Sequence, residues 1–128
     1  CADSARFADP HGKFPMTPLW GMSQRLPRRI GPLRAKEIMF TGRVVSGAEA
    51  AAIGLANLAV PEADLRERTR ALALQIVASS WHTLRADKML VDGGQNLGLR
   101  DGLQFERDNS PGRGPDMEAR LKAFAAKA

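Results

Sequence analysis

His11 is the residue of this 128-residue chain whose type and setting best suit acid–base chemistry. An imidazole titrates near neutral pH and can therefore take up and release a proton during a reaction. His11 lies in Asp9-Pro10-His11-Gly12, a segment that Pro and Gly keep irregular. The other histidine, His82, follows Trp81 in a helical pattern, and we interpret it as a partly exposed helix residue. His11 is therefore the candidate catalytic residue.

The chain carries none of the local motifs that make a self-contained catalytic or phosphate-binding site. It has no G-x-S-x-G elbow, no G-x-x-x-x-G-K-[ST] loop, no G-x-G-x-x-G after a strand and no H-E-x-x-H motif. Cys1 is the single cysteine, and no His/Cys cluster has metal-ligand spacing. We therefore expect no disulfide and no metal site.

Basic residues are concentrated in one stretch of a chain whose net charge is +5. The six are Arg25, Arg28, Arg29, Arg34, Lys36 and Arg43. Such a cluster attracts a phosphate-bearing small molecule, and a solvated helix face is the alternative interpretation. Two Trp, five Phe and no Tyr leave little for base stacking, so nucleic acid is not the expected partner.

The helices and strands that position His11 lie within the first 64 residues, and each is predicted to be short. Proline and glycine interrupt residues 1–22 and exclude a long helix there. Ser23 is predicted to cap a helix that ends at Ile30. The elements predicted next are a helix from Gly31-Pro32 to Phe40, an extended piece at Val44-Val45, a helix opened by the capping box Ser46-Gly47-Ala48-Glu49 and closed at Gly54, and a strand over Leu55–Val60.

Residues 65–128 are predicted to be helical. Leu65, Leu72, Leu74, Ile76 and Val77 are expected on one side of a first amphipathic helix, and further helices over residues 81–91, 97–107 and 116–127. These helices can only partly cover one another, so we expect an oligomer. No eighteen-residue apolar run and no secretory pattern is present, and we expect a cytoplasmic protein with no membrane partner.

An ordered set of short motifs resembles the crotonase superfamily of enoyl-CoA hydratases and isomerases. These are Ala5-Arg6-Phe7, Gln24–Gly31, Arg34–Glu37, Thr41-Gly42-Arg43, Glu49-Ala50, Gly54–Asn57, Val60-Pro61 and Ala123-Phe124 with Lys127. The set spans essentially the whole chain and corresponds to the second half of a family member. The resemblance implies an α/β, crotonase-like (ClpP/crotonase) spiral fragment in residues 1–64. It implies a helical trimerisation region in residues 65–128, a mainly helical chain, and a homo-trimer or hexamer.

The resemblance also implies an enzyme that acts on an acyl-CoA thioester through a stabilised enolate. Two backbone N–H groups hold the enolate oxygen in such enzymes, and fixed dipoles of this kind need no reorganisation as the charge develops. These donors and the first catalytic glutamate come from segments N-terminal to this one. We therefore expect this chain to be incomplete as a catalyst and to work with the N-terminal half of the same protein. Coenzyme A enters as part of the substrate, and no separate cofactor is implied.

The place of the second hydratase glutamate, after a proline, is held by His11. An imidazole does not reproduce a charged carboxylate, so isomerisation, hydrolysis, decarboxylation or a lost activity stay open beside hydration. Leu19, Trp20 and Gly21 occupy the family's glycine-rich stretch and imply a reshaped acyl pocket, with local repacking as the alternative. Phe124 and Lys127 match positions that contact the adenine and phosphates of CoA, or form an ordinary helix end.

Two other functions stay open. The first is a non-catalytic acyl-CoA-binding or assembly subunit of the same fold. The second is a basic protein that engages nucleic acid, which would bind through phosphate contacts that weaken with salt.

Overall fold

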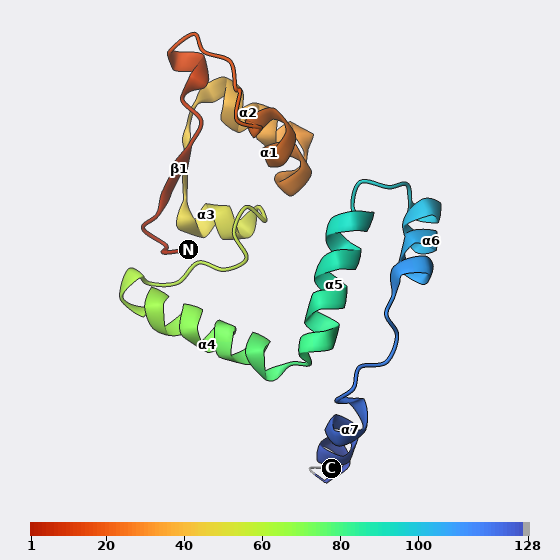
Figure 1. Cartoon of the computed structure of the whole chain (residues 1–128). Helices are drawn as coiled ribbons and strands as arrows, with labels where there is room; N and C mark the ends of the chain where they lie inside the picture. The colour runs from red at the N-terminus through yellow and green to blue at the C-terminus, as the bar shows by residue number, and fades with distance from the viewer. Residues whose placement is uncertain (127–128) are drawn as a thin grey trace. The chain divides into compact units, whose positions relative to one another are not determined.

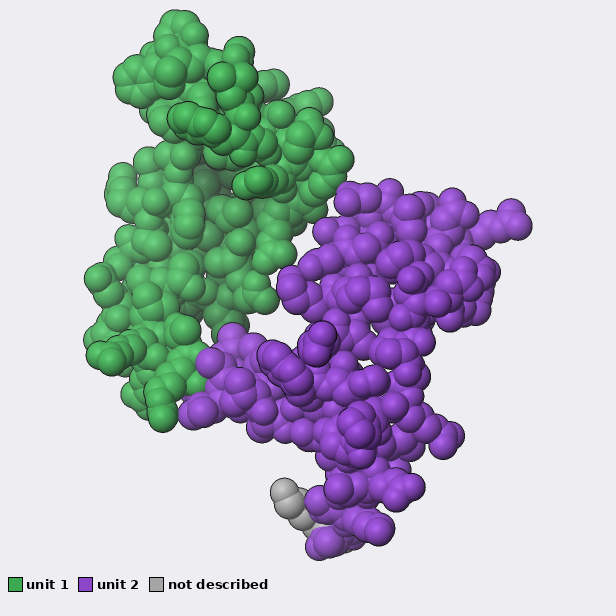
Figure 2. Space-filling model, viewed as in Figure 1, with its two compact units in different colours: residues 1–70 green, residues 71–128 purple. Residues whose placement is uncertain are grey.

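The computed structural model describes residues 1–126, which fall into two compact units (Figure 2). Unit 1 is Cys1–Arg70 and unit 2 is Ala71–Ala128. The division lies within helix α4 (Leu65–Ala78), whereas the sequence places it at residue 64, directly before this helix.

Unit 1 is built on a small antiparallel sheet. Strand β1 (Arg6–Ala8) pairs with β2 (Val44–Ser46), and Phe7 lies opposite Val45. Val45 is fully buried, as expected for a β-branched side chain on the covered face of a strand. The predicted extended piece at Val44-Val45 is therefore confirmed.

Two helices pack together beside this sheet in unit 1 (Figure 1). They are α1 (Met22–Ile30) and α2 (Pro32–Thr41), with Gly31 between them at φ 84°. Leu26, Ile30, Ala35, Ile38, Val45 and Ala50 form the buried core. The two predicted helices are confirmed, but Ser23 does not cap the first one. Gly21 is the N-cap, at φ 89°, so Ser23 already lies inside the first turn.

Helix α3 (Gly47–Ala52) begins as predicted, because Ser46 Oγ accepts the backbone N–H of Glu49 at 3.2 Å. The predicted strand over Leu55–Val60 is wrong. The N–H groups of Leu55 and Ala56 donate to the carbonyl of Ala50, closing the helix end, and are thereby withdrawn from strand pairing. Only Val60 pairs, in a parallel bridge with Ala2. Two short 3-10 turns complete unit 1, η1 (His11–Lys13) and η2 (Glu62–Asp64).

Unit 2 continues from α4 through α5 (Trp81–Gly94), α6 (Leu99–Asn109) and α7 (Met117–Ala125) (Figure 1). All four predicted helices are present. Helices α5 and α6 pack against each other, and an added Cβ at Gly93 would lie 2.5 Å from Cζ of Phe105. Asp116, which caps α7, accepts a hydrogen bond from Ser80 Oγ at 2.9 Å and pairs with Arg120.

The helices of unit 2 leave their apolar side chains open. No residue of 71–126 is buried, and Leu72, Leu74 and Ile76 of α4 are each 48% exposed. A rotation of about 100° per residue places Leu74 on roughly the opposite side of the helix from Leu72, so the expected single apolar side is wrong. In the part of the chain that the structure describes, no helix has the length and apolarity needed to cross a membrane.

Candidate functional site

A buried carboxylate holds His11 at the start of η1. Asp9 follows β1 directly and is 1% exposed, because its strand is covered by the core of unit 1. Its Oδ1 accepts the backbone N–H of His11 at 3.1 Å and also bonds Nδ1 of the His11 ring. The His11 side chain is 17% exposed. One oxygen atom of Asp9 therefore fixes both the turn and the ring that follows it.

The Asp9 contact bears on which ring nitrogen of His11 carries the proton. An ionised carboxylate can only accept hydrogen bonds, so a neutral ring that bonds it would donate through Nδ1. In the neutral imidazole the lone pair then resides on Nε2, which has no hydrogen-bond partner among residues 1–126. Such a nitrogen can accept a proton.

The predicted acyl-binding residues adjoin this pair. The ring of Trp20 lies 6.5 Å from that of His11, centroid to centroid, at a tilt of 60°. Leu19 and Trp20 are 85% and 84% exposed, and Gly21 turns the chain into α1. The structure thus brings the ring of Trp20 next to that of His11 and leaves the side chains of Leu19 and Trp20 exposed.

A cavity of about 340 Å³ lies next to Asp9 within unit 1. Its lining is mostly apolar: Arg6, Phe7, Ala8, Asp9, Met22, Leu26, Ile38, Val45 and Leu55. The size and lining suit an apolar group. None of the predicted site residues lines it, since Asp9 was not among them.

The two predicted CoA-binding residues at the end of the chain belong to unit 2. Phe124 lies on α7, is 75% exposed, and lines a pocket of about 510 Å³ together with Arg113 and Arg120. Lys127 lies outside the described residues. His82 is half-buried on α5, as predicted, and its Nε2 lies 3.1 Å from the carbonyl oxygen of Gly112.

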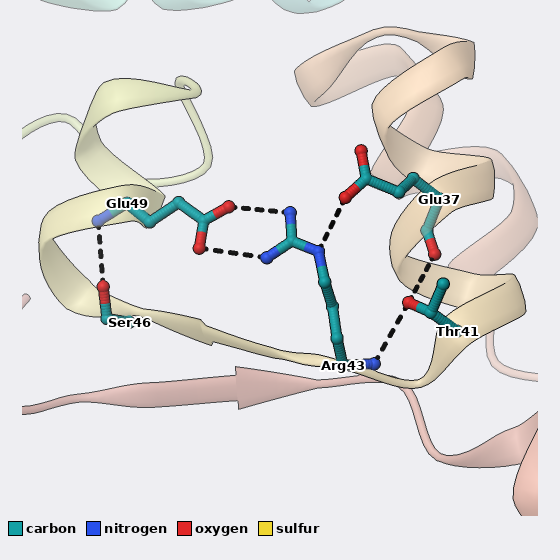
Figure 3. Close-up of polar contacts among 5 residues, drawn as sticks. All are labelled: Glu37, Thr41, Arg43, Ser46 and Glu49. Atoms are coloured by element: carbon teal, nitrogen blue, oxygen red, sulfur yellow. Dashed lines mark hydrogen bonds and ion pairs between the residues drawn. The ribbon is translucent and has the colours of Figure 1, made fainter.

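The predicted basic cluster is partly engaged within the protein. Arg43 bonds Glu37 Oε1 through Nε at 2.7 Å, and its two terminal nitrogens bond the Glu49 carboxylate at 3.0 and 2.7 Å (Figure 3). Arg29 donates to Asn57 at 3.1 Å. Glu49 and Glu37 raise the pKa of Arg43, and the hydrogen bonds from Arg43 lower the pKa of Glu49. Arg43 therefore links α2, β2 and α3 and is not a free phosphate ligand.

Acid should weaken unit 1 through Glu49. The pKa of its carboxyl lies below the ordinary value of 4.5 because Arg43 bonds the ionised form. The unfolded chain then binds the proton more readily. The stabilisation is complete above pH 4.5 and is lost as the pH falls through the lowered pKa. In urea unfolding from about pH 7 to about pH 3, the stability difference between wild type and Glu49→Gln should shrink with acid.

The matched control for this titration is Glu67→Gln. Glu67 is exposed on α4 and has no ion pair among the described residues. Its substitution should give a small change in the free energy of unfolding at each pH. A Glu49→Gln difference that does not shrink with acid would contradict the role of the Arg43 pair.

Asp9 is a candidate site residue that the sequence analysis did not single out. Its signal was the spacing, because an Asp two residues before another residue commonly accepts that residue's backbone N–H in a turn. In residues 1–126 no group of three or more His, Cys, Asp or Glu side chains could hold a metal ion. The Asp9–His11 pair offers an imidazole that could transfer a proton, next to the exposed ring of Trp20.

Known proteins are similar to this chain both in sequence and in fold. Residues 1–124 match the family Enoyl-CoA hydratase/isomerase. The mitochondrial enoyl-CoA hydratase domain-containing protein 2 of Bos taurus is 36% identical, over 84% of this chain and 41% of that protein. The enoyl-CoA hydratase structure of Bacillus anthracis superposes with a TM-score of 0.92 and 34% identity, over 98% of this chain and 50% of that one.

A third relative was solved with a bound thioester. The Thermobifida fusca structure in complex with acetoacetyl-CoA has a TM-score of 0.77 and 28% identity, over 95% of this chain and 45% of that one. This chain spans about half the length of the curated relatives it matches. Its mainly helical structure with one short sheet is a partial crotonase fold. On sequence and on fold, the chain belongs to the enoyl-CoA hydratase/isomerase (crotonase) family.

Proposed function

We propose that this protein acts on an acyl-CoA thioester through a stabilised enolate, with His11 as the group that carries the proton. The observation that carries the proposal is the Asp9–His11 pair, whose Nε2 is left to accept a proton beside the exposed Trp20. Family membership supports the substrate class, as does the acetoacetyl-CoA bound to the Thermobifida fusca relative.

The proposed chemistry needs one base and one oxyanion site. Nε2 takes a proton from a carbon of the acyl chain, the C–H electron pair moves toward the thioester oxygen, and the enolate is then reprotonated at a different carbon. That sequence is an isomerisation. In hydration, Nε2 would take a proton from water whose oxygen adds to the β-carbon, and the α-carbon would then be protonated. One imidazole suffices for the first, whereas hydration commonly divides its two proton transfers between two carboxylates.

We place the oxyanion donors outside this chain, which makes it incomplete as a catalyst. The chain spans about half the length of its curated relatives, which leaves room in a longer protein for the remaining groups. The cavity beside Asp9 and the neighbouring residues Leu19, Trp20 and Gly21 would form one wall of the acyl pocket. Phe124, together with Lys127, would contact the CoA moiety.

The same proposal includes a homo-trimer or hexamer. Its support is the apolar surface of unit 2, where Leu72, Ile76, Leu99 and Leu121 are all close to half exposed or more. A monomeric protein seldom leaves so many large apolar side chains uncovered. Sedimentation at several concentrations tests this, and a monomer throughout would count against it.

A turnover assay separates the proposed enzyme from its alternative. Protein that includes the preceding half should convert crotonyl-CoA, seen as loss of the conjugated thioester absorbance, or exchange substrate protons with deuterated water if it isomerises. Binding of CoA with neither turnover nor exchange would favour a non-catalytic acyl-CoA-binding or assembly subunit. If the protein neither binds CoA nor turns over acyl-CoA, both the proposed enzyme and the proposed binding subunit are rejected.

A further inference from the structure

We propose that Asp9 is a positioning residue that locks His11 in the Nδ1–H tautomer. The consequence is that Nε2 alone carries the lone pair of the neutral ring. This inference rests on the proposed function for its purpose, but it can be measured without any substrate.

The geometry around Asp9 Oδ1 carries the argument. The backbone N–H of His11 reaches this oxygen at 3.1 Å, and the ring Nδ1 of the same residue bonds it too. Two nitrogen atoms of one residue thus face one oxygen atom. In the Nε2–H tautomer, Nδ1 would point its lone pair at this carboxylate oxygen and the two would repel, so the contact favours a protonated Nδ1.

Burial makes this contact consequential. Asp9 is 1% exposed, and no buried polar side-chain atom among residues 1–126 lacks a partner. A carboxylate withdrawn from water is stabilised by the hydrogen bonds that it accepts. The chain therefore loses stability if the ring turns away, and Asp9 resists that motion.

His82 provides a control inside the same chain. Its Nε2 lies 3.1 Å from the carbonyl oxygen of Gly112, which can only accept, so His82 should carry its proton on Nε2. The only two histidines of this sequence are thus expected in opposite tautomers.

The test is nitrogen NMR of the 128-residue chain labelled with ¹⁵N-histidine, at a pH of about 8, where unperturbed imidazole is neutral. His11→Gln identifies the His11 signals by their loss. Wild-type His11 should show a protonated Nδ1 and an unprotonated Nε2, with the reverse for His82. A protonated Nε2 in wild-type His11 would overturn the proposal.

Two substitutions of Asp9 test whether its accepting oxygen or its negative charge fixes the tautomer of His11. Asp9→Ala removes the acceptor, so the His11 signals should shift toward the average of both tautomers while those of His82 stay fixed. Asp9→Asn keeps one oxygen that can accept both hydrogen bonds. The flipped amide would place its NH₂ group against two N–H donors, which is unfavourable. The Nδ1–H tautomer should therefore survive in Asp9→Asn. Its loss there, or an unchanged tautomer in a folded Asp9→Ala protein, would overturn the inference.

Turnover measurements distinguish failure of this inference from failure of the proposed function. Asp9→Ala should lower kcat because the base is misoriented, and KM should change less than kcat because Asp9 is only one of the nine residues that line the proposed acyl pocket. A locked tautomer in a protein that neither turns over nor exchanges acyl-CoA protons would reject the proposed function and leave the positioning intact. Turnover with kcat unchanged in Asp9→Ala would reject the catalytic purpose of the positioning.

Discussion

Replacing His11 by Gln should lower kcat for acyl-CoA turnover by about 100- to 10,000-fold, the usual contribution of a general acid or base. Gln has a similar reach, and its amide N–H can still donate to Asp9, so the local turn should persist. It cannot take up a proton at neutral pH. The proton transfer would be lost while the apolar residues beside it, Leu19 and Trp20, stay in place.

The measurement that checks this pairs a turnover assay with CoA binding by calorimetry. The Kd for CoA should be unchanged in His11→Gln, because the loss concerns only the transition state. His82→Gln is the matched control, since His82 bonds a backbone carbonyl in unit 2, and its kcat should remain at the wild-type value. Wild-type turnover in His11→Gln would reject the role given to this residue.

Gly47→Ala should clearly lower the folding stability of unit 1. Gly47 is buried at the start of α3, and an added Cβ would lie 1.9 Å from the carbonyl oxygen of Ala2. That oxygen belongs to backbone and cannot rotate away as a side chain could. Ala2 is also held in place by its bridge with Val60 and by the bond from Asp3 N–H to the Val60 carbonyl at 2.8 Å.

The expected cost is about 1–3 kcal/mol, typical of overpacking in a core. Urea unfolding measures it. Gly102→Ala is the matched control, because an added Cβ in α6 would make only an ordinary contact at 3.8 Å. Alanine within a helix should then stabilise the protein by roughly 0.5–1 kcal/mol. A Gly47→Ala protein as stable as wild type would contradict the close approach of the two segments.

Much of the fold follows from local signals. Helix positions were predicted because caps, prolines and glycines act within a few residues of where they occur, as at Ser46 and Gly31-Pro32. The error at Leu55–Val60 has the opposite origin. A short apolar run suits a strand only if its N–H groups are available, and the end of α3 uses two of them.

The residues of the candidate site also fall into those that the sequence indicates and those whose setting depends on the fold. His11 could be proposed as a candidate from its type and its irregular segment, and the family could be recognised from an ordered set of motifs. The role of Asp9 could not, because its burial depends on β1 pairing with β2, strands about 40 residues apart in sequence. In the sequence, Arg43 likewise belongs to a cluster that is expected to bind phosphate. Only in the folded chain do Glu37 and Glu49 lie on either side of it and pair with it.

The sequence by itself thus determined which segments form helices, which family the chain resembles and which histidine could move a proton. Those properties depend on residue types and on spacings of a few residues, which act directly on the local backbone. Only the tertiary structure decided how that histidine is held, which basic residue is already paired, and where two backbones meet at Gly47. The reason is physical: burial and the choice of hydrogen-bond partner depend on groups that are distant along the chain and adjacent only after folding.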